Sequence, residues 1–235
     1  NRLICIEKDE YHYHEMIAHP VILTCTNIKN VLIIGGGDGG TAREVLKHHQ
    51  IEKVEIVEID PLVVEASKQH LPKLSVAFEN PKLKLHIADA MVYIDNLAEN
   101  SFDLIIIDGP HSSGTLSPLY SKSFYKKCKK ILTPDGAFVV QGESPKFNER
   151  AFIQIDKNLK HVFGERSKKN ILFNVPTFPS GIWSFQVVLP NQNNPLQVSK
   201  DKIDYFVKIQ KTAYYNYETH LAAFAMPEYI KQLLQ

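Results

Sequence analysis

The sequence predicts an α/β protein whose doubly wound parallel sheet carries helices on both faces. Short apolar runs alternate with stretches of helical pattern, as in chains built from repeated strand–helix–strand units. One such run, at 31–34, leads directly into the glycine-rich stretch 35–40, which reads GGGDGG. A strand that turns through glycines into a helix is typical of nucleotide-binding sheets. Acidic residues follow several of the predicted strands, at the edge of an open sheet where ligands bind.

The chain begins with a predicted strand end and a short helix. Residues 3–10 have the pattern of the end of a strand, and residues 10–19 that of a helix, which Pro20 is expected to end. His14 and His19 lie five positions apart, which places them about 140° apart around a helix axis. Two zinc-binding histidines on one helix face are four positions apart. No metal site is therefore predicted.

The middle of the chain supplies the predicted sheet. The four apolar residues at 31–34 predict a strand that is buried on both faces. The glycines after it allow a sharp turn and leave room for a ligand close to the backbone. Pro61 suits the first position of a helix, and Asp60 suits its N-cap. Further strands are predicted at 53–60, 84–87, 102–108 and 136–141, and helices at 41–47, 61–71, 121–132 and 148–163. Beyond Leu189 the alternation gives way to a loop at 190–195 and a tail with one or two short helices.

Composition narrows the class of protein. The chain has 235 residues, of which 44% are hydrophobic and 23% charged, as in a globular domain of ordinary size. Its formal net charge of +1 gives no reason to expect a nucleic acid or an anionic membrane as partner. No apolar run approaches the roughly 20 residues that span a bilayer, and the N-terminus does not resemble a signal peptide. The three scattered cysteines form neither a disulfide framework nor a zinc spacing. We therefore expect a cytoplasmic protein.

The glycine-rich stretch leaves two classes of ligand open. Gly35, Gly37 and Gly40 satisfy the spacing G-x-G-x-x-G, which is also found in sites for nicotinamide or flavin dinucleotides. Glu58 lies 18 residues after Gly40, where an acid can accept hydrogen bonds from ribose hydroxyls. Asp89, followed by Ala90, could accept a hydrogen bond from an adenine amino group. The alternative role for each of these acids is a helix N-cap.

The charge of the predicted site favours one of these classes. Asp38, Glu58, Asp89 and Asp108 all follow predicted strands and would meet at one edge of the sheet. Four carboxylates close together repel one another. A cationic ligand relieves this repulsion, whereas a pyrophosphate increases it. The acids therefore favour a positively charged nucleoside, such as a sulfonium, over a dinucleotide.

Several motifs together resemble those of the spermidine synthase family of aminopropyltransferases. They are the stretches at 9–16 (DEYHYHEM), 35–40 (GGGDGG), 57–60 (VEID), 176–181 (PTFPSG), 214–216 (YYN) and 222–227 (AAFAMP). This resemblance implies a methyltransferase-like Rossmann sheet. It also implies three parts of the chain. Residues 1–24 hold the remnant of an N-terminal β-domain and the Tyr-His-Glu helix, and residues 25–190 form the nucleoside-binding catalytic domain. Residues 191–235 form a helical tail that packs on this domain.

The resemblance also implies a reaction. Members of the family transfer an aminopropyl group from decarboxylated S-adenosylmethionine to an amine, most simply from putrescine to spermidine, and release methylthioadenosine. The nucleoside is then a co-substrate, and no tightly bound cofactor is expected. By this resemblance, the residues expected to bind the donor are Gly35, Gly37, Asp38, Gly39, Glu58, Asp89 and Ala90. The expected catalytic residues are Asp108 and Tyr13. The residues expected to bind the acceptor are His14, His111, Gln141 and Phe178. A homodimer or homotetramer is expected.

Two positions depart from the family pattern. His111 stands where a second aspartate usually follows Asp108, and Phe178 stands where a tyrosine is usual. A neutral imidazole can accept a hydrogen bond, but it lacks the charge that attracts a distal ammonium group. The predicted donor-binding residues therefore all match the family pattern, whereas the identity of the acceptor amine stays open.

Two other functions remain open at this point. One is an S-adenosylmethionine-dependent methyltransferase, and the other is a non-catalytic protein that keeps the nucleoside pocket. Asp38 argues against the methyltransferase, because a carboxylate there would repel the methionine carboxylate and attract the ammonium group of the decarboxylated form.

Overall fold

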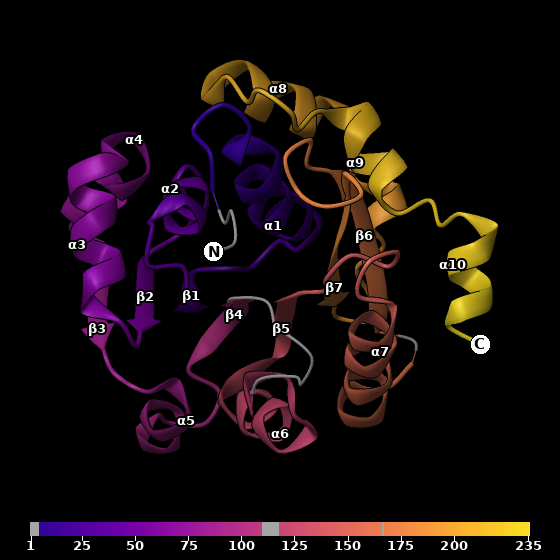
Figure 1. Ribbon diagram of the computed structural model, residues 1–235, viewed down its shortest axis with the longest axis horizontal. Coiled ribbons are helices and arrows are strands. Elements are labelled where there is room, and N and C mark those ends of the chain that lie inside the picture. Colours follow the sequence, from indigo (N-terminus) through magenta and orange to yellow (C-terminus); the bar gives the residue numbers. More distant parts are fainter. Residues whose placement is uncertain (1–4, 110–117, 166) are drawn as a thin grey trace.

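A seven-stranded sheet in the order β3-β2-β1-β4-β5-β7-β6 forms the centre of the molecule (Figure 1). The computed structural model describes residues 5–109, 118–165 and 167–235. The strands are β1 (Asn30–Gly35), β2 (Lys53–Glu58), β3 (Leu83–Ile87), β4 (Phe102–Asp108), β5 (Leu132–Gln141), β6 (Lys168–Asn174) and β7 (Ile182–Val188). The first five strands are parallel, and β7 pairs antiparallel with both β5 and β6. The predicted α/β fold class is confirmed, with a mixed rather than an all-parallel sheet.

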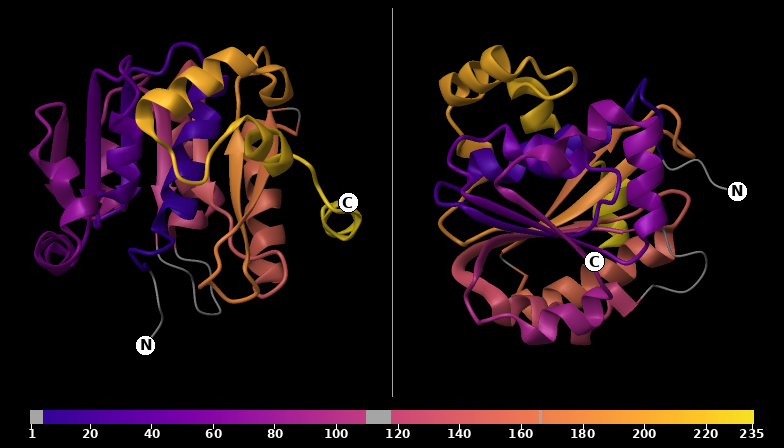
Figure 2. Two further views of the ribbon diagram at one scale, coloured as in Figure 1. Left: turned by 90° about the horizontal axis from the view of Figure 1, so that it is seen from above. Right: turned by 90° about the vertical axis from the view of Figure 1, so that its left-hand side faces the viewer.

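Helices cover both faces of this sheet (Figure 2). In the described residues they are α1 (Glu10–Thr24), α2 (Gly40–Leu46), α3 (Pro61–His70), α4 (Pro72–Ser75), α5 (Ala90–Tyr93), α6 (Lys122–Ile131), α7 (Glu149–Phe163), α8 (Lys200–Gln210), α9 (Tyr217–Ala223) and α10 (Glu228–Leu233). Short 3₁₀ turns lie at Val76–Glu79, Ile94–Asn96, Pro118–Tyr120 and Pro195–Gln197. The strands and helices predicted between 31 and 163 are therefore present, most with ends within a few residues of those predicted, and Asp60 caps α3 through a 2.9 Å hydrogen bond from the amide of Leu62.

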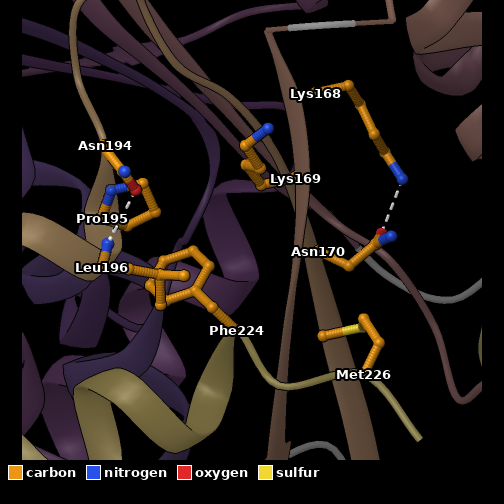
Figure 3. Close-up of a pocket in the computed structure, with 8 residues that line it drawn as sticks. All are labelled: Lys168, Lys169, Asn170, Asn194, Pro195, Leu196, Phe224 and Met226. Atoms are coloured by element: carbon orange, nitrogen blue, oxygen red, sulfur yellow. Dashed lines mark hydrogen bonds between the residues drawn. The ribbon is translucent and has the colours of Figure 1, made fainter.

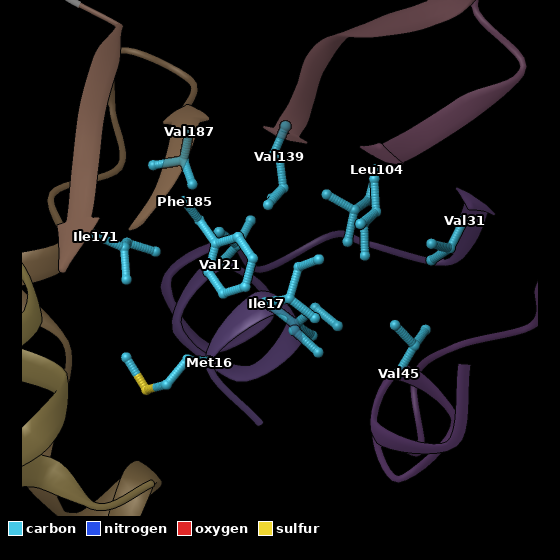
Figure 4. Packing of buried hydrophobic residues seen from close by; sticks show 14 of the residues in the cluster. Met16, Ile17, Val21, Val31, Val45, Leu104, Val139, Ile171, Phe185 and Val187 are labelled. Carbon is cyan, nitrogen blue, oxygen red and sulfur yellow. The ribbon is translucent and has the colours of Figure 1, made fainter. Parts of the chain in front are cut away.

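Alternate residues of the central strands build two separate cores. In β1, Val31 and Ile33 pack with α1 and α2 (Figure 4). Leu32 and Ile34 pack on the opposite face with α6 and α7. Because successive strand residues point to opposite faces, an uninterrupted apolar run is what a strand covered on both sides requires.

The first helix corrects two predictions. Residues 7–9 form a turn, and residues 5–10 contain no strand; residues 3 and 4 of the predicted strand end lie outside the described residues. Helix α1 continues through Pro20 to Thr24, although a proline inside a helix costs about 3 kcal/mol. The residues after it, Val21, Ile22 and Leu23, are almost completely buried, and burying one such side chain contributes roughly 1.5–3 kcal/mol. Their burial therefore outweighs the cost of the proline.

The C-terminal third of the chain differs from the prediction in two further ways. Strands β6 and β7 were not predicted, and they add an antiparallel edge to the sheet. The tail holds three helices, α8 to α10, rather than one or two. In the part of the chain that is described, no helix is both long enough and apolar enough to span a membrane.

Candidate active site

The glycine turn after β1 packs directly against the end of β4. Gly35 has φ +83°, and a Cβ atom there would lie 2.1 Å from the carbonyl oxygen of Asp108. The Gly36 amide donates a 3.0 Å hydrogen bond to the same oxygen. Only glycine fits this position, since both the backbone conformation and the contact exclude a side chain. The turn therefore brings the loop that carries Asp38 next to Asp108.

Asp108 is the centre of the site. One carboxylate oxygen accepts a 2.7 Å hydrogen bond from the Tyr13 hydroxyl of α1, and the other accepts a 2.5 Å bond from the Thr41 hydroxyl of α2. Burial and the negative charge of Asp38 raise the pKa of Asp108, while His14, Thr41 and Tyr13 oppose that shift. Burial and the Asp108 charge hold the pKa of Tyr13 well above its usual value. Tyr13 is therefore a fixed donor, and Asp108 is a carboxylate that can take up a proton more readily than usual.

A buried histidine separates Asp38 from another acid. The His14 ring lies between Glu10, at 2.6 Å, and Asp38, at 3.5 Å. Burial would lower the pKa of His14, but the two carboxylates outweigh it and raise that pKa to about 10. The charge of His14, together with hydrogen bonds from His14 and the Gly40 amide, holds the pKa of Asp38 low despite its burial. The ring fits because position 40 has no side chain: a Cβ there would lie 2.4 Å from it.

The predicted ribose and adenine residues lie at the ends of β2 and β3. Glu58 ends β2, and a Cβ atom on Gly37 would lie 2.9 Å from its carboxylate. Gly39, in the left-handed conformation, precedes α2. Asp89 accepts a 2.8 Å hydrogen bond from the Met91 amide as the N-cap of α5, whose first residue is the buried Ala90. The Glu58 side chain thus fills part of the space beside Gly37. Asp89 makes the hydrogen bond of a helix N-cap, which is the alternative role predicted for it.

Two of the predicted acceptor residues, Gln141 and Phe178, lie on the other side of Asp108, whereas His14 pairs with Glu10 and Asp38 instead. Gln141 ends β5, one position beyond the pair formed by Ile107 of β4 and Val140 of β5. Phe178, in the loop between β6 and β7, has its ring 6.2 Å from that of Tyr13 and 4.9 Å from that of Trp183. The structure thus brings Tyr13, Gln141 and Phe178 around Asp108. His111 lies outside the described residues.

Sequence reasoning missed three residues of this region. Thr41 holds Asp108, as described above. Glu143 lies two residues after Gln141, is buried, has φ +67°, and accepts a 2.5 Å hydrogen bond from Asn148. Tyr120 is buried, and its hydroxyl lies 3.4 Å from the carbonyl oxygen of Gly109, the residue after Asp108; burial and the charges of Glu143 and Asp108 raise its pKa. A carboxylate just beyond a strand end was a usable signal for Glu143, whereas nothing marks Thr41 or Tyr120 in the sequence.

The histidines of α1 belong to different clusters. His14 contacts Glu10 and Asp38, whereas His19 lies 3.0 Å from Glu44 and 3.0 Å from His48. Within the described ranges, no group of three or more histidine, cysteine or acidic side chains has the geometry of a metal site.

A separate pocket lies at the outer edge of β6 (Figure 3). Its lining residues are Lys168, Lys169, Asn170, Asn194, Pro195, Leu196, Phe224 and Met226. None of them is a carboxylate, and none belongs to the group around Asp108. The candidate site is therefore the carboxylate-rich edge at the ends of β1 to β5.

Comparisons with known proteins agree with this geometry. The spermine/spermidine synthase domain matches residues 10–200. A polyamine aminopropyltransferase of Bacillus cereus is 39% identical over 229 residues, which cover 97% of this chain and 80% of the relative. One from Methanocaldococcus jannaschii is 41% identical over 230 residues, covering 97% and 78%.

Solved structures give the same result. A spermidine synthase in complex with the transition-state analogue AdoDATO superposes with a TM-score of 0.91 at 37% identity, covering 98% of this chain and 78% of that one. The spermidine synthase of Thermotoga maritima gives 0.88 at 37% identity, covering 98% and 77%. The predicted resemblance is confirmed: this chain belongs to the spermine/spermidine synthase family.

Proposed function

We propose that the protein transfers the aminopropyl group of decarboxylated S-adenosylmethionine to a diamine, most simply putrescine, and releases methylthioadenosine. The observation that carries this proposal is the position of Asp108, which lies beside Asp38 and accepts hydrogen bonds from Tyr13 and Thr41. The reaction needs a base for an amine next to a site for a cationic donor, and this group of residues can supply both.

The reaction can be followed atom by atom. An alkylamine is protonated at neutral pH and has no lone pair to attack with until its proton is removed or held. Asp108 accepts that proton. The amine nitrogen then attacks the aminopropyl carbon bonded to sulfur, a carbon–nitrogen bond forms, and the carbon–sulfur bond breaks. Its electron pair stays on sulfur, which becomes the neutral thioether of methylthioadenosine. Tyr13 keeps the Asp108 carboxylate oriented throughout.

Charge selects the donor. Asp38 is held ionised by His14 and the Gly40 amide, so it attracts the free ammonium group of the aminopropyl chain. Intact S-adenosylmethionine carries a carboxylate near that position, and Asp38 would repel it. Glu58 binds the ribose, and Asp89 with Ala90 binds the adenine end. These assignments favour aminopropyl transfer over methyl transfer.

The acceptor side offers a carboxylate for a second ammonium group. Glu143 lies two residues beyond the end of β5, the strand that pairs with β4, and β4 ends at Asp108. We infer that the reacting end of the diamine lies at Asp108, between Gln141 and Phe178, and that its distal end points towards Glu143. This arrangement supplies the charge that His111 lacks.

The decisive experiment is mass spectrometry of the products formed from decarboxylated S-adenosylmethionine and a mixture of polyamines. We expect methylthioadenosine and an aminopropylated amine in equal amounts. A parallel reaction with S-adenosylmethionine tests the methyltransferase alternative. Methylated amines in that reaction, with no aminopropylated product in the first, would overturn the proposal, and so would binding of the nucleoside without any product.

A further inference from the structure

The loop between β6 and β7 is a closed unit that forms one wall of the candidate acceptor site. The Val175 amide donates to the Gly181 carbonyl, the Phe178 amide to the Val175 carbonyl, and the Gly181 amide to the Phe178 carbonyl, at 2.9–3.0 Å. Ser180 and Gly181 both have positive φ values. These bonds shape residues 175–181, but they do not fix where the loop lies against the rest of the molecule.

A carboxylate from the N-terminal end of α1 holds this loop in place. One oxygen of Asp9 accepts a 3.1 Å hydrogen bond from the Thr177 amide and a 2.6 Å bond from the Thr177 hydroxyl. The two residues are 168 positions apart in the chain. Asp9 is 7% exposed, so the negative charge of its carboxylate is largely withdrawn from water and gains more from these two donors than an exposed one would.

The use of Asp9 is unusual for its position. It is the N-cap residue of α1, where an aspartate ordinarily accepts a hydrogen bond from an amide in the first turn of its own helix. The Asp9 side chain makes no such bond. It contacts the loop instead, so the helix forgoes a cap that would contribute about 1 kcal/mol to its stability.

The loop reaches the reacting groups through its next residue. Phe178 packs on the ring of Tyr13, whose hydroxyl donates to Asp108. On the other side of the loop, the Ser180 hydroxyl lies 2.9 Å from that of Ser144, the residue after Glu143. The loop therefore lies between α1 and the end of β5, and a displacement at Thr177 would move Phe178 relative to Tyr13.

We propose that Asp9 and Thr177 position the acceptor wall, so that their contact sets how well the amine is bound and leaves donor binding unchanged. This inference rests on the proposed function. The loop contacts the acceptor half through Phe178 and Ser180, whereas the predicted donor residues Asp38, Glu58 and Asp89 lie at β1, β2 and β3.

The test replaces the hydroxyl of Thr177 and leaves α1 unchanged. Thr177→Val keeps the size of the side chain and loses the donor, while Thr177→Ser keeps the donor and serves as the rescue variant. Thr133→Val is the matched control, because Thr133 also donates its hydroxyl to an aspartate, Asp103 at 3.3 Å, but near the start of β5. The kinetic constants for amine and nucleoside are measured separately, and amide hydrogen exchange is followed at Phe178 and Gly181 without substrates.

For Thr177→Val we expect the KM for the amine to rise about fivefold, which is less than the full effect of losing a charge-assisted hydrogen bond because the Thr177 amide still donates to Asp9. The KM for the nucleoside should stay within twofold, and exchange should be faster at Phe178 and Gly181. Thr177→Ser and Thr133→Val should behave like the parent protein. An unchanged KM for the amine would overturn the inference whether or not exchange became faster, and so would an equal rise in both KM values. A parent protein without transferase activity would refute the proposed function instead, and unchanged exchange in Thr177→Val would then still refute the contact on its own.

Discussion

The hydroxyl of Tyr13 lies 2.7 Å from a carboxylate oxygen of Asp108, although the two residues are 95 positions apart in the chain. This bond joins α1 to the end of β4. Because burial and Asp108 raise the pKa of Tyr13 well above its usual value, the hydroxyl keeps its proton and always donates. A hydrogen bond to an ionised carboxylate stabilises its charged form. Tyr13 and Thr41 therefore limit a rise in the pKa of Asp108 that burial and Asp38 cause.

Replacing Asp108 with asparagine should abolish turnover and leave nucleoside binding nearly unchanged. Asparagine keeps the size of the side chain but cannot accept a proton from the amine. General bases contribute about 10²–10⁴-fold to a rate, and a loss of that size in kcat is expected. Calorimetry with decarboxylated S-adenosylmethionine measures the binding. Turnover within a few-fold of the parent would exclude Asp108 as the base.

Removing the Tyr13 hydroxyl should move the acid limb of the pH–rate profile to higher pH. The base must be ionised, so kcat/KM falls as the pH drops through the pKa of Asp108. That pKa is already raised, and Tyr13→Phe removes a bond that favours the ionised form, so the limb should shift upward. The matched control is Tyr93→Phe, since Tyr93 also donates to a carboxylate, Glu55 at 2.6 Å, at β2. Tyr93→Phe should keep the acid limb of the parent. If Tyr13→Phe also kept it, the Tyr13 hydroxyl would have no part in setting the pKa of Asp108.

The sequence predicted β1, β4 and the apolar half of β5 because they are apolar runs buried on both faces, and it predicted β2 because only Glu55 interrupts the apolar residues Val54, Ile56 and Val57. It did not predict β7, in which the buried residues Ser184 and Gln186 interrupt the apolar pattern. The Ser184 hydroxyl donates to the Glu143 carbonyl, and the Gln186 amide donates to the Phe152 carbonyl. Polar residues that are satisfied by such distant partners cannot be told from surface residues in a sequence.

The sequence likewise predicted the site residues that follow buried strands. Asp38, Glu58 and Asp108 stood out because each follows a buried strand, and the structure places each of them at the end of its strand or in the turn after it. The contact of Asp9 with Thr177 was not predictable, because it joins segments that come together only when β6 and β7 add to the sheet.

Asp38→Asn should weaken binding of the decarboxylated nucleoside about tenfold. It should also reduce the ratio by which the protein binds this nucleoside more tightly than S-adenosylmethionine. A hydrogen bond to a charged group contributes about 1.5–3 kcal/mol, and a tenfold change in affinity corresponds to about 1.4 kcal/mol. Calorimetry with both nucleosides gives the two affinities. The Gly40 amide can still donate to the asparagine oxygen, so the turn should remain intact. Equal affinities in parent and variant would mean that Asp38 serves only the turn.

His14 should remain protonated at every pH from 5 to 9. Its pKa of about 10 exceeds the value of about 6.5 of an unfolded chain. Its ion pairs therefore stabilise the fold fully below about pH 6.5, and this contribution is lost as the pH rises through about 10. Glu10→Gln removes one of the two carboxylates and should lower the pKa of His14. Nuclear magnetic resonance of the ring protons measures both values, and a parent His14 that titrates near 6.5 would contradict the assignment.

Two positions, Glu143 and His111, are candidates for binding the distal ammonium group of the acceptor. If Glu143 binds it, Glu143→Gln should raise the KM for putrescine about tenfold, because one charge-assisted contact becomes neutral. The KM for a monoamine of similar length should change little, since that amine has no second ammonium group. The side chain of Gln is as large as that of Glu and can still contact Asn148, so the fold should be retained.

The companion variant is His111→Asp, which restores the carboxylate usual at that position and should lower the KM for putrescine. It should also weaken the dependence of that KM on pH, since a free imidazole gains charge below about pH 6.5 and would repel the amine. The two variants separate the possible sites. An effect of Glu143→Gln alone would assign the distal ammonium group to Glu143, and an effect of His111→Asp alone would assign it to position 111. Equal changes for diamine and monoamine in Glu143→Gln would show that Glu143 supports the fold and does not contact the acceptor.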